Sequence, residues 1–138
     1  MALYLLPLRH SSLSNSGLVG TIPDAVGAFV DMESFNVQNS RLNGSLPASM
    51  SAWKRVAHFD VRGSKLHTAL PVLNYRAMTQ CVLCGVGEPS DPCGKNGFGN
   101  YFSCPFPQGV TDRCTKYNGN MEYQPITNAD CYNTTASE

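Results

Sequence analysis

Polar and apolar side chains alternate over two short stretches near the middle of the chain. Residues 34–39 read SFNVQN and residues 58–62 read HFDVR, so every second side chain is apolar. A period of two indicates a β-strand with its apolar side toward a core and its polar side toward solvent. We therefore predict a strand in each stretch, with the polar side chains forming an outward face.

The two predicted strands belong to a longer pattern that returns at a constant spacing along the chain. Residues 18–23 read LVGTIP, residues 42–47 read LNGSLP and residues 66–71 read LHTALP. Phe29 and Trp53 are separated by the same spacing, which places Trp53 in an apolar column of the core rather than in a ligand site. A unit of this length cannot bury its apolar side alone, so neighbouring units are expected to stack.

This repetition predicts an α/β solenoid over residues 1–80. About three units of 24 residues would supply equally spaced parallel strands on a concave face. Leu42 and Leu46 are expected to point into the core from the returning chain. Gly44 permits a positive φ at the bend, and Pro47 suits a segment that leaves the hydrogen-bonded ladder.

Several positions depart from the repeat. Ser11 occupies a column that is apolar in the other units, which predicts a weak or frayed first strand. Thr68 stands where the earlier units have Gly, which predicts a slightly different bend. In a fourth unit counted at the same spacing, Asn74 and Gln80 replace apolar residues and only Leu83 keeps the register. We therefore expect the repeat to end there.

The cysteines all follow the repeat. An even number of them in a segment rich in Gly, Pro and Asn favours a disulfide framework and an oxidising compartment. Zinc is the alternative, because Cys81 and Cys84 have the spacing of half a zinc site, but no second pair of that kind follows. We expect residues 81–138 to be a cap and tail of loops pinned by disulfides, tethered to the last turn by Cys81 or Cys84. The candidate disulfide residues are Cys81, Cys84, Cys93, Cys104, Cys114 and Cys131.

Charge and hydropathy exclude several classes of protein. Charged residues make up 14% of the chain, and ten basic residues balance ten acidic ones. Without a net charge or a Lys/Arg cluster, nucleic acid is not expected as a partner. No apolar run approaches the roughly 18 residues of a membrane span, so no direct membrane insertion is expected. No phosphate loop, metal pair or carboxylate dyad in context is present, and we expect no cofactor, no metal and no catalysis.

Two Asn-x-Ser/Thr triplets are candidate glycosylation sites, at Asn43 and Asn133. Such triplets matter only in a protein that follows the secretory route. The repeat itself supplies the Gly-Ser pair after Asn43, so we expect Asn133 to be used more readily than Asn43.

The columns of the second unit, FVDMESFNVQNSRLNGSLP, resemble a leucine-rich repeat, and the Gly-x-Leu-Pro ending is similar to the plant-specific class. In that class an Asn hydrogen-bonds the turning backbone from inside; here Ser16, Ser40 and Ser64 fill the column, and a hydroxyl has a shorter reach. Residues 1–84 also resemble the repeats of the trypanosomatid promastigote surface antigen family, which carry small hydroxyl residues there. The resemblance implies a secreted or lipid-anchored surface protein that binds partners through its repeats.

The outward face of the predicted strands is the candidate ligand site, because concave faces of stacked repeats are used for binding. The residues predicted to line it are Asn36, Gln38, His58, Asp60 and Arg62. A solvated polar face without a partner is the alternative. His58 and Asp60 share a face, which permits a proton relay, but no Ser or Cys nucleophile is placed beside them.

Two interpretations of function stay open. One is an extracellular or cell-surface leucine-rich repeat module that binds a protein or glycan partner through its concave face. The other is a passive structural element of a surface coat, or a non-functional fragment of a longer repeat protein. Because residues 1–138 show no Ser/Thr-rich stalk or anchor signal like those of many surface antigens, we expect a secreted form or a fragment. His67 falls in a coil column, where we expect it to be exposed and inert.

Overall fold

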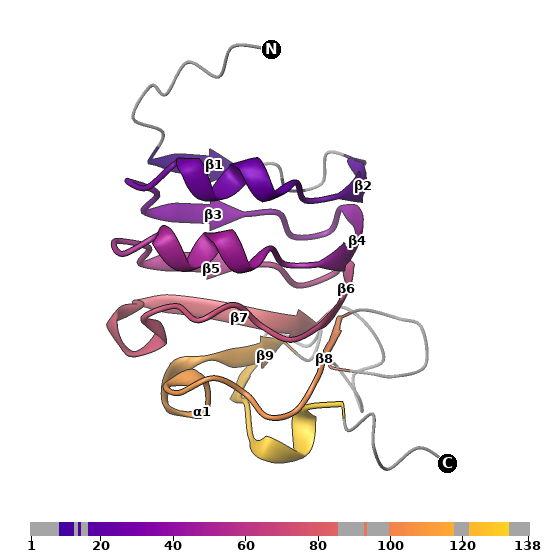
Figure 1. The fold of residues 1–138 in the computed structure, drawn as a ribbon. Coiled ribbons are helices and arrows are strands. Elements are labelled where there is room, and N and C mark those ends of the chain that lie inside the picture. Colours follow the sequence, from indigo (N-terminus) through magenta and orange to yellow (C-terminus); the bar gives the residue numbers. More distant parts are fainter. Residues whose placement is uncertain are drawn as a thin grey trace.

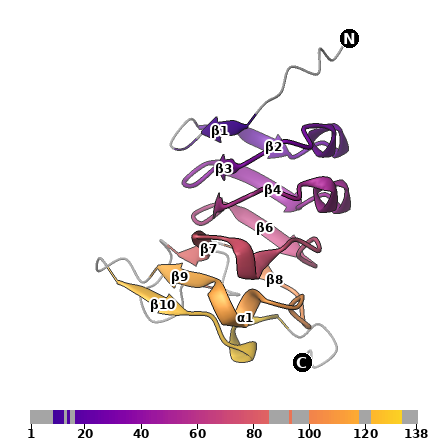
Figure 2. The ribbon, with the colours of Figure 1, turned by 90° about the vertical axis from the view of Figure 1, so that its left-hand side faces the viewer.

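Parallel strands in two sheets make up most of the regular structure of this α/β protein. The computed structural model describes residues 9–12, 14, 17–85, 93, 100–117 and 122–132. Within these residues one sheet has six strands, in the order β1-β3-β5-β7-β9-β10, and the other has four, in the order β2-β4-β6-β8. Successive strands of each sheet lie one below another (Figure 1, Figure 2). The predicted α/β class with parallel strands is confirmed.

The six-stranded sheet carries the candidate ligand face. Its neighbouring strands run parallel, except for the last pair, which is antiparallel. The strands are β1 (His10–Ser12), β3 (Ser34–Asn36), β5 (His58–Asp60), β7 (Gln80–Gly85), β9 (Thr115–Tyr117) and β10 (Tyr123–Pro125).

The four-stranded sheet and several short helical turns complete each unit. All its strands are parallel: β2 (Val19–Thr21), β4 (Arg41–Ser45), β6 (Lys65–Thr68) and β8 (Tyr101–Phe102). A 3₁₀ turn follows each of the first three of them. The helical elements are η1 (Asp24–Ala28), η2 (Ala48–Ala52), η3 (Tyr75–Ala77), α1 (Val110–Arg113) and η4 (Asn128–Asp130).

The register of the six-stranded sheet follows the period of the sequence as far as β5. Ser34 pairs with His58, and Phe35 pairs with Phe59. Both Phe rings are buried, with their centroids 6.0 Å apart, whereas His58 is exposed on the other side of its strand. The alternation predicted for the two stretches is therefore confirmed.

The next strand enters the sheet two residues early. Phe59 pairs with Cys81, whereas an unchanged period would bring Leu83 to that place. At this shorter spacing Tyr75, Met78 and Leu83 fall in the apolar columns, and all three are buried. The prediction that only Leu83 keeps the register is wrong, because the unit became shorter while its apolar columns persisted.

Trp53 lies in the core that the units share. It is only 1% exposed, and its ring centroid is 5.1 Å from that of Phe35. Its indole Nε1 donates a hydrogen bond of 3.1 Å to the carbonyl of Val26, in the preceding unit. Leu42 and Leu46 are also buried, so the predicted core columns of this unit are confirmed.

The bend after each strand of the four-stranded sheet uses the left-handed backbone region. Gly20 and Gly44 have φ of 101° and 82°, as the glycine of this column allows. Thr68, at the corresponding bend, also has a positive φ, of 66°, although its β-branched side chain makes this backbone region unfavourable. The hydroxyl of Thr68 donates a 2.6 Å hydrogen bond to Ser45 Oγ of the unit above, which helps to hold it there.

Hydroxyl and amide groups hydrogen-bond the turning backbone from inside. Ser40 and Ser64 are buried, their Oγ atoms are 3.0 Å apart, and Ser40 Oγ donates to the carbonyl of Val37. Ser16 lies outside the described residues. A serine hydroxyl therefore reaches the backbone and its neighbouring unit despite its short side chain.

A residue of the cysteine-rich part supplies the next inner contact. Asn100 is fully buried, and its Nδ2 donates to the carbonyls of Val61 and Leu83 at 2.6 and 2.7 Å. Its Oδ1 accepts a 2.8 Å hydrogen bond from the N–H of Leu66. One amide thus serves three backbone groups from the segments around β5, β6 and β7.

All the cysteines are paired in three disulfides, so the predicted disulfide framework is confirmed. No thiolate is left as a zinc ligand, because the bonds include every cysteine sulfur. The bond between Cys81 in β7 and Cys114 after α1 tethers the C-terminal part to the sheet, as predicted. The pairs are Cys81–Cys114, Cys84–Cys93 and Cys104–Cys131.

The C-terminal part contains regular elements as well as loops, so the prediction of loops alone is wrong. β8 continues the four-stranded sheet, and β9 continues the six-stranded sheet with a bulge in β7 between Val82 and Cys84. These elements are two to four residues long and form against an existing edge. They are too short to show a period of their own.

Candidate binding face on the six-stranded sheet

One row of exposed or half-buried polar residues crosses the outward face of the six-stranded sheet. The strand register aligns His10, Ser34, His58 and Gln80, and we call these residues the outer row. His10, His58 and Gln80 are exposed, and Ser34 is half-buried. A row of neutral donors and acceptors on a rigid sheet suits hydrogen bonding to a neutral or mixed partner.

The predicted ligand residues divide into two groups. His58 is exposed, and Asn36 and Gln38 are half-buried, so these three reach the outward face. Asp60 is only 4% exposed, and the Arg62 side chain is 12% exposed. The prediction of an exposed His-Asp-Arg row is therefore wrong, because later segments of the chain cover two of its members.

Arg62 is the centre of a cluster that fills this part of the face. Its Nε donates to Gln38 Oε1 at 3.0 Å and lies 3.4 Å from Asp60 Oδ2. Its guanidinium carbon lies 4.5 Å from the ring centroid of Tyr117, and Nη1 donates to the Tyr123 hydroxyl at 3.1 Å. We call these five residues the arginine cluster; its cation is already paired within the protein.

Asp60 is held at the base of the arginine cluster. Besides the ion pair, its Oδ1 accepts a 3.3 Å hydrogen bond from the Arg62 backbone N–H. Burial raises the pKa of the Asp60 carboxyl, and this effect outweighs the lowering by the Arg62 charge and by its backbone hydrogen bond. The carboxylate is therefore costly to ionise in the folded chain.

Asp60→Asn is expected to remove a pH-dependent part of the stability. A folded-state pKa above the ordinary 3.8 means that the folded chain binds the proton more tightly than the unfolded chain. The contribution of Asp60 to the free energy of unfolding therefore falls as pH rises from about 3.8 to the folded-state pKa. Urea denaturation of both proteins over a pH series measures the difference; a difference that grows in favour of the native protein over this window would contradict the account.

The proton-relay alternative loses its geometric basis. His58 Nε2 lies 3.2 Å from Thr79 Oγ1, and the Asp60 carboxylate contacts Arg62 instead. Among the described residues, no group of three or more His, Cys, Asp or Glu side chains is arranged to hold a metal ion. The outward face consists of hydrogen-bonding and aromatic groups, which are suited to recognition.

A small hollow lies beside the arginine cluster, where β7, β9 and β10 meet. It has a volume of about 210 Å³, and Tyr123 belongs to both features. The strands and α1 that surround it lie together at one end of the molecule (Figure 2). The residues that line the hollow are Thr79, Gln80, Cys81, Val82, Arg113, Thr115 and Tyr123.

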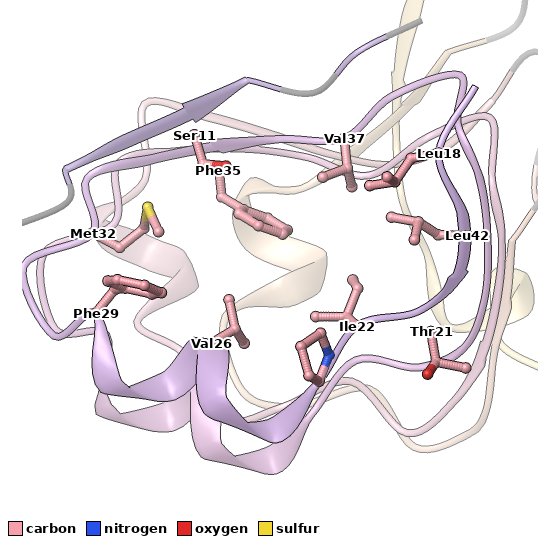
Figure 3. Close-up of a pocket in the computed structure, with 11 residues that line it drawn as sticks. Ser11, Leu18, Thr21, Ile22, Val26, Phe29, Met32, Phe35, Val37 and Leu42 are labelled. Carbon is pink, nitrogen blue, oxygen red and sulfur yellow. The ribbon is translucent and has the colours of Figure 1, made fainter. Parts of the chain in front are cut away.

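A second cavity, of about 180 Å³, lies in the core of the first unit. Apolar side chains from several segments, among them Phe29, Met32 and Phe35, point into it (Figure 3). Ser11 lines it in the column where the next unit has Phe35, so a short side chain leaves space there. β1 nevertheless pairs with β3 along its length, so the short Ser11 side chain leaves its space in the adjoining core and not in the backbone pairing.

The remaining candidate residues lie away from this face. Asn43 is exposed in β4, on the four-stranded sheet, and Asn133 lies outside the described residues. His67 is half-buried and stacks on Tyr101 with ring centroids 5.3 Å apart, so the expectation that it is exposed is wrong. No helix among the described residues is long and apolar enough to cross a membrane.

Sequence comparisons add no relative to this picture. No protein-family model matches the chain, and no curated protein matches it. The interpretation of its function therefore rests on its own residues.

The sequence analysis did not predict several residues of the site, among them Gln80, Arg113, Tyr117 and Tyr123. At the fixed period Gln80 falls in a column that is apolar in the earlier units, whereas the shorter fourth unit places it in the outer row. The other three lie in the cysteine-rich part. Their aromatic and cationic character is evident, but nothing local indicates that they return to the face of strands far earlier in the chain.

Proposed function

We propose that this chain is a leucine-rich repeat module of the plant-specific type, with its units forming a solenoid and its outward sheet face binding a protein or glycan. The support for the fold is the constant strand register between β1, β3 and β5, and the bend and core columns that recur within the chain. The resemblance to promastigote surface antigens is part of the proposal and rests on the same columns. Residues 81–138 act in it as a disulfide-bonded cap.

The observation that carries the binding proposal is the outer row. Four polar side chains from four successive parallel strands stand in register, and the row ends at a hollow lined by further polar groups. Rigid strands hold such groups in place before a partner arrives, which lowers the entropy lost on binding. Asn36 and His58 are the predicted ligand residues that remain available on this face.

An extracellular or cell-surface location fits the proposal. Three disulfides are compatible with an oxidising compartment, where such bonds persist. Asn43 is exposed and open to glycosylation on the secretory route. We propose that a sugar there would not obstruct the binding face, because β4 belongs to the four-stranded sheet.

A passive structural role is the second candidate, and one observation favours it. Asp60 and Arg62, the charged residues of the predicted ligand patch, are consumed by contacts within the chain. A face that satisfies its own charges would serve as a stable surface without a partner. The two candidates differ in whether the remaining polar residues contribute to binding.

The test is binding of the labelled full chain, expressed with its disulfides, to immobilised arrays of glycans and extracellular protein domains. We expect Asn36→Ala/His58→Ala to weaken the strongest array interaction at least about tenfold, because both side chains lie on the proposed contact face. Arg41→Ala/Lys65→Ala is the matched control, since both residues are exposed on the four-stranded sheet. Equal binding by the two variants, or no array binding at all, would support the passive role.

A further inference from the structure

We propose that the hollow beside the arginine cluster binds a carboxylate-bearing sugar residue of a glycan, with Arg113 as the anchor for the carboxylate. This proposal rests on the proposed function and specifies its ligand. The hollow, of about 210 Å³, has room for about seven waters, which suits one small ligand unit rather than a drug-sized molecule.

Arg113 provides the cation of the hollow. It is exposed, and within the described part of the chain its side chain forms no hydrogen bond or ion pair. The adjacent Asp112 is already paired with Arg76 at 2.7 Å, and Lys116 is paired with Asp130 at 2.7 Å. Arg113 is therefore free to meet an anion, and its planar guanidinium matches a carboxylate in a bidentate pair.

The other lining groups suit the hydroxyls and the ring of a sugar. Gln80 offers an exposed amide, and Thr79 and Thr115 also line the hollow. The Thr79 hydroxyl already donates to the Ala57 carbonyl at 3.2 Å, so toward a ligand it can act as an acceptor. Thr115 Oγ1 donates to the Cys81 carbonyl at 3.1 Å, so its hydroxyl can act toward a ligand only as an acceptor. Val82 adds an apolar surface beside these groups, so the hollow combines hydrogen-bonding and apolar contacts as ligand sites do.

Tyr123 supplies a fixed aromatic wall. Its side chain is half-exposed, while its hydroxyl accepts the hydrogen bond from Arg62 and its ring lies 5.0 Å from that of Tyr117. The arginine cluster therefore holds this ring in place before a ligand binds. Because Arg62 is already paired within the arginine cluster, Arg113 is the cation of the hollow that can attract an anionic ligand.

The mixture of groups favours a sugar acid over an acidic peptide side chain. The side chain of an aspartate or glutamate would pair with Arg113, but it carries no hydroxyls beside its carboxylate and no ring face to cover Tyr123. A sugar acid brings a carboxylate, several hydroxyls and an apolar ring face in one unit. It can therefore satisfy the polar wall and cover Tyr123 at the same time.

The test is an NMR titration of the isotope-labelled full chain with a hyaluronan tetrasaccharide, whose glucuronate carries the carboxylate. We expect the amide signals of Gln80 and Thr115 to shift, and Arg113→Gln to weaken binding at least about tenfold. Arg41→Gln is the control, because it removes the same charge from the four-stranded sheet. The same tetrasaccharide with its carboxyls reduced to alcohols is expected to bind as weakly as the acid does to Arg113→Gln.

Three outcomes would overturn the proposal. One is equal binding of the acidic and reduced sugars, and another is binding of a tetraglutamate peptide as tight as that of the tetrasaccharide. The third is that none of three acidic glycans binds: the hyaluronan tetrasaccharide, a trigalacturonate and sialyllactose. If any of these occurs while Asn36→Ala/His58→Ala still weakens array binding, the face remains a binding surface and the assignment of the hollow alone fails.

Discussion

Replacing Asn100 with Ala is expected to lower the free energy of unfolding by roughly 3–5 kcal/mol. The side chain is fully buried and hydrogen-bonds three backbone groups, the N–H of Leu66 and the carbonyls of Val61 and Leu83. Alanine would leave these groups without that partner in the interior. Each unpaired group costs roughly 1–3 kcal/mol, and a void adds to the loss.

Urea denaturation of the oxidised chain measures this effect. Asn74→Ala is the matched control, because Asn74 is exposed and its side chain makes no capping hydrogen bond to η3. We expect the control to stay within about 0.5 kcal/mol of the native protein. Similar midpoints for the two variants would show that Asn100 does not hold the C-terminal part to the inner backbone.

Trp53→Ala is expected to cost roughly 3–5 kcal/mol, because it removes the largest side chain of the shared core. The loss includes the contact with the Phe35 ring and the hydrogen bond from Nε1 to the Val26 carbonyl. The hydrogen bond joins the second unit to the first, so the variant should also loosen the first unit from the second. Hydrogen exchange of the η1 amides would report that loosening.

Trp53→Phe separates packing from hydrogen bonding. It keeps an aromatic ring in the core but cannot donate to Val26, so we expect a cost of about 1–2 kcal/mol. The comparison is made by the same urea denaturation. If Phe proves as destabilising as Ala, the hydrogen bond rather than ring burial dominates, which would contradict the packing account.

The core columns were predictable because their signal is local and repeated. Phe35 and Phe59 each alternate with polar neighbours, and the second alternation follows the first at the spacing of one unit. Gly44 lies in the same column as Gly20, and Trp53 lies in the same column as Phe29. Gly44 has the positive φ, and Trp53 has the burial, that these columns predict. Repetition lets several weak local preferences agree on one register.

The fixed period of the sequence does not predict the fourth unit, because the spacing from β5 to β7 is two residues shorter than the spacing between the earlier strands. Cys81, rather than Leu83, pairs with Phe59. The apolar side chains of Tyr75 and Met78 were present, but each comes two positions before the place that the fixed period assigns to its column. One unit shorter by two residues places both side chains in their columns.

The facing of the candidate site was predictable, whereas its accessibility was not. Alternation alone places His58 and Asp60 on the side of their strand opposite to Phe59. Burial of Asp60 and pairing of Arg62 depend on the β9–β10 pair, since Tyr123 reaches Arg62 from 61 residues further along the chain. No local pattern contains that contact.

The amino-acid sequence by itself determined the parallel strands, the apolar columns, the bend at Gly44 and the commitment of the cysteines to disulfides. These features follow from short-range periodicity, backbone preference and an even cysteine count. Tertiary structure alone decided that Asn100 would serve the inner backbone and that Tyr123 and Arg113 would border the same face. The reason is physical: each of those arrangements combines segments far apart in the chain, and only the folded path brings them together.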